Sequence, residues 1–218
     1  MAPSKNAYFW REWKIKVNDI QQETINTYNK SAKALSVYFQ GIGSRVDDID
    51  RAFKLADCPT DARVVEIGCG DGRDAREIIK HTNQFTGFDI SEELIKLANQ
   101  SVPGVKFVVA DAREYAYPRD LDIVFAFASL LHLDKNEVKK VLGKVKNSLR
   151  PRGIVYISLK YSDVYMEKVK EDEYGKRLFY FYNPDLIQEL AGSAYKTVYV
   201  NQETIGQTEW FDIALQKK

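Results

Sequence analysis

Three glycines at alternate positions, Gly68, Gly70 and Gly72, most strongly constrain what this chain can fold into. They follow an apolar run rich in β-branched residues over positions 62–67, which predicts a strand buried on both faces. Glycine adopts positive φ without strain and lets a ligand approach the backbone closely. Positions 73–80 are expected to form a helix whose N-terminal amides face the turn. This stretch therefore predicts a strand, a tight turn and a helix that together cradle a nucleotide-like ligand.

Acidic residues end the next two predicted strands. Asp89 ends the run 85–89, where an acid in a doubly wound sheet accepts hydrogen bonds from ribose hydroxyls. Its alternative role, capping the next helix, is one that Ser91 can fill itself. Asp111 ends the run 105–111 and is a candidate acceptor for an adenine amino group, or else a turn aspartate. Both acids are expected near the glycine turn.

A fourth predicted strand, over residues 121–128, leads into a candidate general base. The strand ends beside the glycine turn, at the carboxyl edge where open sheets bind ligands. His132 follows it, and an unperturbed imidazole pKa of about 6.5 suits proton transfer at neutral pH. The alternative is a histidine that packs or caps at the start of the helix expected from Asp134.

Together these residues resemble the class I S-adenosylmethionine-dependent methyltransferases. The resemblance rests on the pattern Glu-x-Gly-x-Gly-x-Gly from Glu66 to Gly72, on Asp89 and Asp111, and on Leu-Leu-His-Leu after the fourth strand. It is to the small-molecule methyltransferase group and covers residues 24–218. It implies a doubly wound, Rossmann-like α/β fold with a seven-stranded sheet, mostly parallel with an antiparallel last strand.

The resemblance also implies an order of parts along the chain. An arm and a helical cap are expected over residues 1–56, and a methyltransferase domain over residues 57–218, in one compact unit. Apolar residues at helical spacing predict helices over residues 18–56, with an interruption at positions 41–43. Residues 160–182, rich in tyrosine, are expected to form a loop on the ligand side. The last two strands are expected to pair as an antiparallel hairpin.

The same resemblance implies S-adenosylmethionine as the cofactor. Asp89 would hold the ribose, Asp111 the adenine amino group, and Ile90 one face of the adenine. The Gly68 carbonyl would bind the methionine ammonium, and Phe127 would lie where the methionine part ends. No metal ion is expected. The full set expected to bind the cofactor is Tyr28, Glu66, Gly68, Cys69, Gly70, Gly72, Arg73, Asp89, Ile90, Asp111, Ala112 and Phe127.

Three of these residues have alternative interpretations. Tyr28 would touch the methionine end of the cofactor, but a core tyrosine on an amphipathic helix fits its pattern equally well. Glu66 is expected to organise the turn and not to react. Arg73 opposes the dipole of its helix, so its charge is compensated either by the cofactor's carboxylate or by Asp71 or Asp74.

Charge and cysteine content limit the partners and the setting. The 218 residues carry a formal net charge of +1, so no global field favours nucleic acid or an acidic membrane. Residues 1–17 mix aromatic and basic side chains, which fits a packing arm better than contact with nucleic acid or a membrane surface. Cys69 lies in the glycine turn, where a disulfide to Cys58 would obstruct the ligand, so a reduced, cytoplasmic setting is expected. No apolar run approaches the roughly 18 residues of a membrane span.

The sequence therefore predicts an S-adenosylmethionine-dependent methyltransferase that moves a methyl group to a small molecule by in-line displacement. The tyrosines over residues 160–182 favour an aromatic or cationic acceptor, because tyrosine faces attract cations. Two other classes stay open. A nicotinamide-dependent oxidoreductase uses a similar turn, but its usual spacing is Gly-x-Gly-x-x-Gly, and here the third glycine comes one residue earlier. A non-catalytic cofactor-binding or partner protein is the other, because the acceptor side has no recognisable signature.

Overall fold

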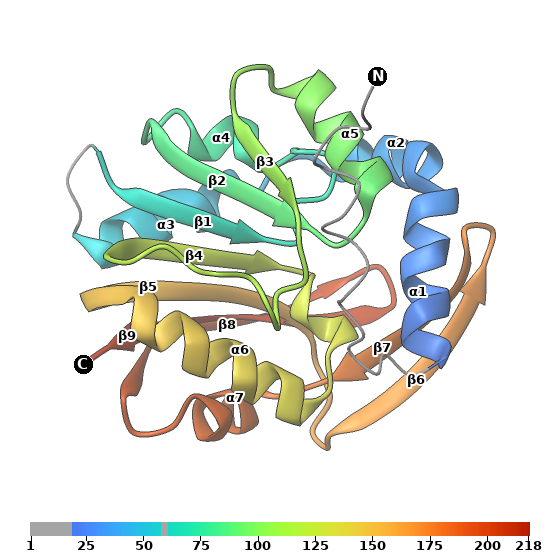
Figure 1. Ribbon diagram of the computed structural model, residues 1–218. Coiled ribbons are helices and arrows are strands. Elements are labelled where there is room, and N and C mark those ends of the chain that lie inside the picture. Colours follow the sequence, from blue (N-terminus) through green and yellow to red (C-terminus); the bar gives the residue numbers. More distant parts are fainter. Residues whose placement is uncertain (1–18, 58–60) are drawn as a thin grey trace, which may run out of the picture.

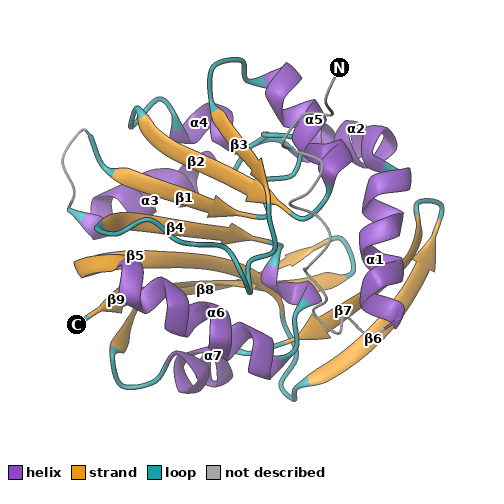
Figure 2. Cartoon of the chain, in the orientation of Figure 1, coloured by secondary structure: helices purple, strands orange, loops and turns teal. Residues whose placement is uncertain are grey.

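Residues 19–57 and 61–218 are described by the computed structural model, which is drawn in Figures 1 and 2. The stretch over residues 1–17 and Cys58 lie outside the described residues, so the expectations for them stay predictions. The helices are α1 (Asp19–Lys30), α2 (Ala32–Ile42), α3 (Val46–Ala56), α4 (Ala75–Ile78), α5 (Glu92–Ser101), α6 (Lys135–Ser148), α7 (Pro184–Ala191) and the short 3-10 helix η2 (Leu130–His132). The strands are β1 (Arg63–Ile67), β2 (Gln84–Asp89), β3 (Lys106–Val109), β4 (Leu121–Phe127), β5 (Leu149–Lys160), β6 (Met166–Asp172), β7 (Gly175–Phe181), β8 (Tyr195–Ile205) and β9 (Thr208–Lys217).

A seven-stranded sheet organises these elements in the order β3-β2-β1-β4-β5-β9-β8. Strands β1 to β5 pair in parallel with their neighbours, while β9 pairs antiparallel with both β5 and β8. The last strand of the chain is thus inserted antiparallel between β5 and β8. This confirms the predicted doubly wound α/β fold with a mostly parallel seven-stranded sheet.

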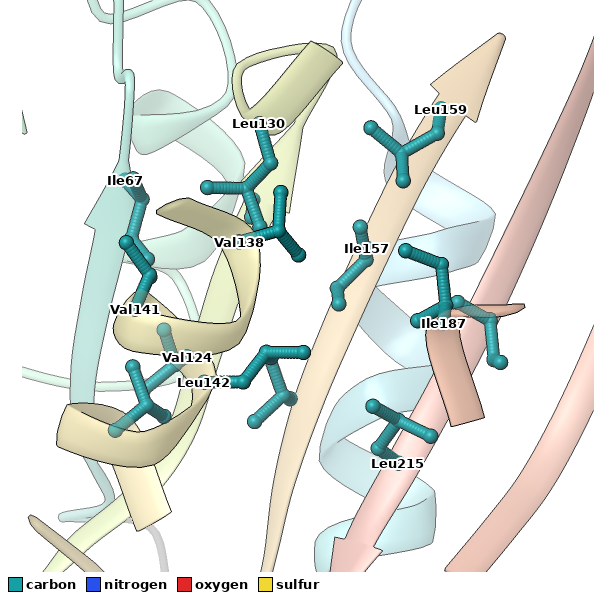
Figure 3. Packing of buried hydrophobic residues seen from close by; sticks show 14 of the residues in the cluster. Ile67, Val124, Leu130, Val138, Val141, Leu142, Ile157, Leu159, Ile187 and Leu215 are labelled. Atoms are coloured by element: carbon teal, nitrogen blue, oxygen red, sulfur yellow. The ribbon is translucent and has the colours of Figure 1, made fainter. Parts of the chain in front are cut away.

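Helices lie on both faces of the large sheet (Figure 2), and alternating side chains of the central strands build one core on each face. Val65 and Val124 point to the face covered by α6 and α7, whereas Val64 and Ile123 point to the face covered by α3 and α4. Figure 3 shows how residues of α6, such as Val138, interdigitate with the first of these cores. Because both faces are covered, the central strands are predominantly apolar, which is why the sequence identified them.

Two elements differ from the sequence prediction. The helix after the glycine turn spans only Ala75–Ile78, whereas residues 73–80 were expected to be helical. It ends early because the amides of Lys80 and His81 donate to the carbonyls three residues back, those of Glu77 and Ile78, and not to those four residues back. Residues 160–182 were expected to form a loop, but most of them form the β6–β7 hairpin, a second sheet of two antiparallel strands. β6 is exposed along its length and has no apolar face, so its sequence does not look like a strand.

The hairpin and α1 stand together at the carboxyl edge of the large sheet, as Figure 1 shows. α1 packs along β7, while α2 contacts α5. The division of the chain at residue 56 into cap and domain stays a prediction. Within the described ranges, no helix is both long and apolar enough to cross a membrane.

Replacing Gly68 by alanine is expected to destabilise the fold strongly. Its φ is +70°, and a Cβ there would lie 2.3 Å from the Ser129 Cβ. We expect a loss of roughly 2–5 kcal/mol from backbone strain and overpacking combined. The matched control is Gly70→Ala, with φ +56° but no atom within 4 Å of the added Cβ, which should cost only about 1–2 kcal/mol. Urea unfolding without ligand measures both, and equal losses would contradict the packing role of Gly68.

Candidate active site

A cavity of about 500 Å³ opens at the carboxyl edge of the parallel strands. Its wall combines the ends of β1, β2, β4 and β5 with parts of α1, α2 and the β6–β7 hairpin. This volume lies in the range of small-molecule and cofactor sites. The location is also the one at which open α/β sheets bind their ligands, because the loops that follow parallel strands meet there.

The glycine turn after β1 is fastened to the end of β2. The amides of Gly68 and Cys69 both donate to the carbonyl of Phe88, at 2.7 and 3.0 Å. The Gly70 amide donates to the Asp89 carboxylate at 3.0 Å. Gly70 has open space beside its Cα, so it is the glycine that lets a ligand approach.

Gly72 has a different position from the one predicted. It is the one residue of the predicted site that does not line the cavity. A Cβ on Gly72 would meet Val102 and Phe107, and its φ is +80°. The third glycine therefore lets the turn pack closely against α5 and β3, inside the protein.

Asp89 accepts two backbone hydrogen bonds at the tip of β2. One oxygen accepts from the Ser91 amide at 2.8 Å and the other from Gly70. Ser91 itself caps α5 by accepting from the Leu94 amide, as predicted, so the aspartate is not needed for that cap. Burial raises the pKa of Asp89, while the amides of Ser91, Gly70 and Ile90 lower it. Each carboxylate oxygen keeps a second lone pair for a ligand hydroxyl.

Glu66 is a buried carboxylate at the end of β1 with an unused acceptor. Its Oε2 atom has no hydrogen-bond partner among the described residues, and the residue is only 2% exposed. Burial, and then the charge of Asp74, raise the pKa of the Glu66 carboxyl well above its usual value. Because buried polar groups are almost always paired, this orphan oxygen on the cavity wall indicates a place for a cationic donor from a ligand.

The charge of Arg73 is compensated inside the protein. Its guanidinium pairs with Asp74, with 2.5 Å between Nη2 and Oδ2. Asp71 instead accepts from the side chains of Ser36 and Gln40, at 2.5 and 2.6 Å. Asp71 therefore fastens α2 to the glycine turn. Of the partners that the sequence allowed for Arg73, the structure shows Asp74.

Asp111 lies in a turn and on the cavity wall. It is a turn aspartate that accepts from the Arg113 amide and pairs with the Arg113 guanidinium. Arg113 also pairs with Glu137, which anchors this turn to α6. Asp111 and Ala112 nevertheless line the cavity, so the carboxylate also remains a candidate acceptor for a ligand amino group.

His132 and Tyr28 form a hydrogen-bonded pair on the cavity wall. The Nδ1 atom of His132 lies 2.6 Å from the carbonyl of Leu178, so Nδ1 carries the proton. The Tyr28 hydroxyl lies 2.8 Å from Nε2 and donates to its lone pair. Burial lowers the pKa of His132 to about 4, and burial raises the pKa of Tyr28. The imidazole is therefore neutral, and its free lone pair is occupied by Tyr28.

The far wall holds residues that the sequence did not single out. Lys160 ends β5 and Arg177 lies in β7, and both line the cavity beside Phe179 and Trp210. Arg45 crosses from the α2–α3 connection to Asp212, at 2.6 Å. In the sequence, the one feature that could have pointed to Lys160 is its position, directly after an apolar strand whose end lies at the ligand edge of the sheet. Every other residue of the predicted site, including Cys69, Ile90 and Phe127, lines the same cavity.

The central part of the chain is similar to known methyltransferases. Residues 64–153 match the model of a family described as a methyltransferase domain. Trans-aconitate 2-methyltransferase of Azoarcus sp. (strain BH72) is 32% identical over 109 residues, which cover 48% of this chain and 42% of that protein. Phosphoethanolamine N-methyltransferase 1 of Triticum aestivum is 28% identical over 153 residues, which cover 64% of this chain and 30% of that protein. The chain thus matches less than half the length of either relative.

The fold is shared with solved methyltransferase structures. A structure described as the DhpI–SAH complex has a TM-score of 0.66 and 18% identity, and the match covers 91% of this chain and 97% of that chain. At 18% identity, this similarity shows that the two chains share a fold. With the family match, it confirms the resemblance to class I S-adenosylmethionine-dependent methyltransferases and the cofactor that the family uses.

The buried, neutral state of His132 predicts a pH dependence of stability. Its folded pKa of about 4 lies below the unfolded value of about 6.5, so the unfolded state binds the proton first as pH falls. The stabilisation is fully present above pH 6.5 and is lost toward pH 4, by up to about 3 kcal/mol. Urea unfolding at several pH values should show that His132→Gln removes this slope, whereas His81→Gln keeps it. A His132 proton signal that titrates near 6.5 by NMR would contradict the assignment.

Proposed function

We propose that this chain, which carries a class I S-adenosylmethionine-dependent methyltransferase domain, transfers the methyl group of S-adenosylmethionine to a small-molecule acceptor. The observation that carries the proposal is the unpaired Oε2 atom of Glu66, which lies on the wall of a cavity shared with Asp89. A ligand with a cationic amino group and neighbouring ribose hydroxyls would satisfy both carboxylates.

The cofactor-binding half of the site fits S-adenosylmethionine residue by residue. This cofactor supplies a methyl group on a sulfonium sulfur, ready for in-line displacement. Glu66 would accept from the methionine ammonium, and Asp89 would accept from the ribose hydroxyls while the Gly70 amide holds it in place. Asp111 would accept from the adenine amino group, and Ile90, which is 36% exposed on the cavity wall, would cover one adenine face.

Most of the catalysis in this proposal comes from positioning and exclusion of water. Tyr28 would face the methionine end of the cofactor, with its hydroxyl held by His132. His132 would then orient Tyr28 and not act as the general base, because its lone pair is occupied and its pKa is about 4. Phe127, at the end of β4, would lie beside the methionine part.

A small-molecule acceptor is supported by the relatives and by the size of the cavity. The names of the two relatives specify trans-aconitate and phosphoethanolamine, both small molecules. The cavity of about 500 Å³ must hold the cofactor and the acceptor together, which leaves room for a small acceptor.

Replacing Asp89 by asparagine should weaken cofactor binding selectively. The change preserves shape but turns one acceptor into a donor, and hydrogen bonds to a charged group are worth roughly 1.5–3 kcal/mol each. Calorimetric titration should show that the unmodified protein binds S-adenosylmethionine and S-adenosylhomocysteine but not NAD. Asp89→Asn should bind the first two about tenfold or more weakly, and exposed Asp185→Asn, outside the cavity, should bind them normally. Binding of NAD alone would contradict the proposal.

Glu66 should release a proton when S-adenosylmethionine binds. Its raised pKa makes the carboxyl protonated in the free protein to a greater extent than usual, whereas an ammonium partner favours the ionised form. Affinity is therefore expected to rise as pH increases through the Glu66 pKa. Calorimetry in buffers of different ionisation enthalpy measures the released proton, and Glu66→Gln should abolish it. Unchanged proton release in Glu66→Gln would rule out this partner for the ammonium.

A further inference from the structure

Lys160 is a partly buried cation on the cavity wall that has no counter-ion among the described residues. Its Nζ atom lies 3.6 Å from the ring centroid of Phe179 and 5.7 and 5.8 Å from those of Trp210 and Phe181. Within the described part of the chain, no carboxylate lies within ion-pair distance of this nitrogen. Burial, together with the charges of Lys170 and Arg177, lowers the pKa of Lys160 to about 8. The ammonium is thus held against aromatic faces and toward the cavity.

Arg177 adds a second cation beside the same aromatic ring. Its Cζ atom lies 5.5 Å from the centroid of Phe179, and the side chain is almost completely buried. Asp172 pairs with one terminal nitrogen of the guanidinium, but Nε has no partner among the described residues. The guanidinium is therefore only partly satisfied by the protein itself.

The charges around this half of the cavity leave a positive excess. Lys160, Lys170 and Arg177 line it together with two carboxylates, Asp172 and Glu173. Asp172 is engaged by Arg177 and lies 3.9 Å from Lys170, while Glu173 is exposed. Aromatic faces offset part of the cost of removing an ammonium from water, but an anion would offset more.

We infer that the methyl acceptor carries an anionic group, a carboxylate or a phosphate, which binds to Lys160 within the field of Arg177. The inference rests on the proposed function, because it names the class of acceptor for the same site. It reverses the expectation of a cationic acceptor. The rings of Phe179 and Trp210, which would attract such a molecule, already face the ammonium of Lys160.

The test uses three probes of similar shape and different charge, and a fourth probe that carries a phosphate. The full-length protein, saturated with S-adenosylhomocysteine, is titrated with phenylacetate, 2-phenylethanol and phenethylamine, and then with phenyl phosphate. We expect phenylacetate or phenyl phosphate to bind at least about tenfold more tightly than the neutral and cationic probes. Calorimetry or ligand-observed NMR measures the affinities.

Variants of two lysines separate the role of Lys160 from a general effect of charge. Lys160→Met should lose the preference for the anion by roughly tenfold or more. Lys168→Met removes the same charge from an exposed position of β6 outside the cavity and should keep the preference. Lys160→Arg should also keep the preference for the anion, because a guanidinium stays positively charged at neutral pH. Loss of the preference in Lys160→Arg together with its retention in Lys160→Met would overturn the inference.

The outcomes separate this inference from the proposed function. If S-adenosylhomocysteine does not bind, the proposed function fails, and the probes are titrated into the free protein to test Lys160 alone. If it binds and the neutral or cationic probe binds as tightly as the anions, only the inference fails. Failure of both anions to bind at millimolar concentration also overturns it.

Discussion

The close contact between Gly68 and Ser129 is the constraint on which the floor of the cavity depends. Gly68 follows β1 and Ser129 follows β4, and a side chain on Gly68 would overlap the Ser129 Cβ. Because the two strand ends meet there, the turn must leave β1 with positive φ and run toward β2. The Phe88 carbonyl and the Asp89 carboxylate at the end of β2 then accept the amides of the turn. This packing contact, the pairing of β1 with β2 and the hydrogen bonds of the turn together hold Glu66 and Asp89 in place relative to each other.

The two halves of the cavity differ in charge. Glu66, Asp89 and Asp111 line the half beside the glycine turn, whereas Lys160 and Arg177 line the half beside the hairpin. In the proposed function, the cofactor brings positive groups to the first half, and in the further inference the acceptor brings a negative group to the second. Complementary charge of this kind favours binding of each molecule in its own half and opposes exchange of their places.

The parts of this site that the sequence predicted are those fixed by local patterns. The central strands β1, β4 and β5 are mostly buried and therefore mostly apolar, whereas β2 and β3 are only partly buried. Asp89 and Asp111 could be placed because Asp89 ends β2 and Asp111 follows β3. Lys160 and Arg177 could not be recognised, because their environment depends on rings from β7 and β9 that meet only in the folded chain. The hairpin was missed for a similar reason: its β6 strand has no apolar face, and it is stabilised through β7.

The arrangement of α1 follows from the free edge of β7. Thr24, Thr27 and Ser31 recur at helical spacing, and their hydroxyls bond to Leu178 N, Lys176 O and Tyr174 O at 2.9, 2.8 and 2.6 Å. One helical turn rises about 5.4 Å and two strand residues span about 6.6 Å, so successive turns of the helix match alternate residues of the strand. α1 thus covers a strand edge with polar side chains, which explains why Thr24 and Thr27 are among its buried residues. Its third buried residue, Gln21, instead donates to Glu137 of α6. Tyr28 of α1 also contacts His132, whose Nδ1 bonds to the Leu178 carbonyl of β7, so α1 and the hairpin cover the cavity together. Separating α1 from the hairpin would break these hydrogen bonds.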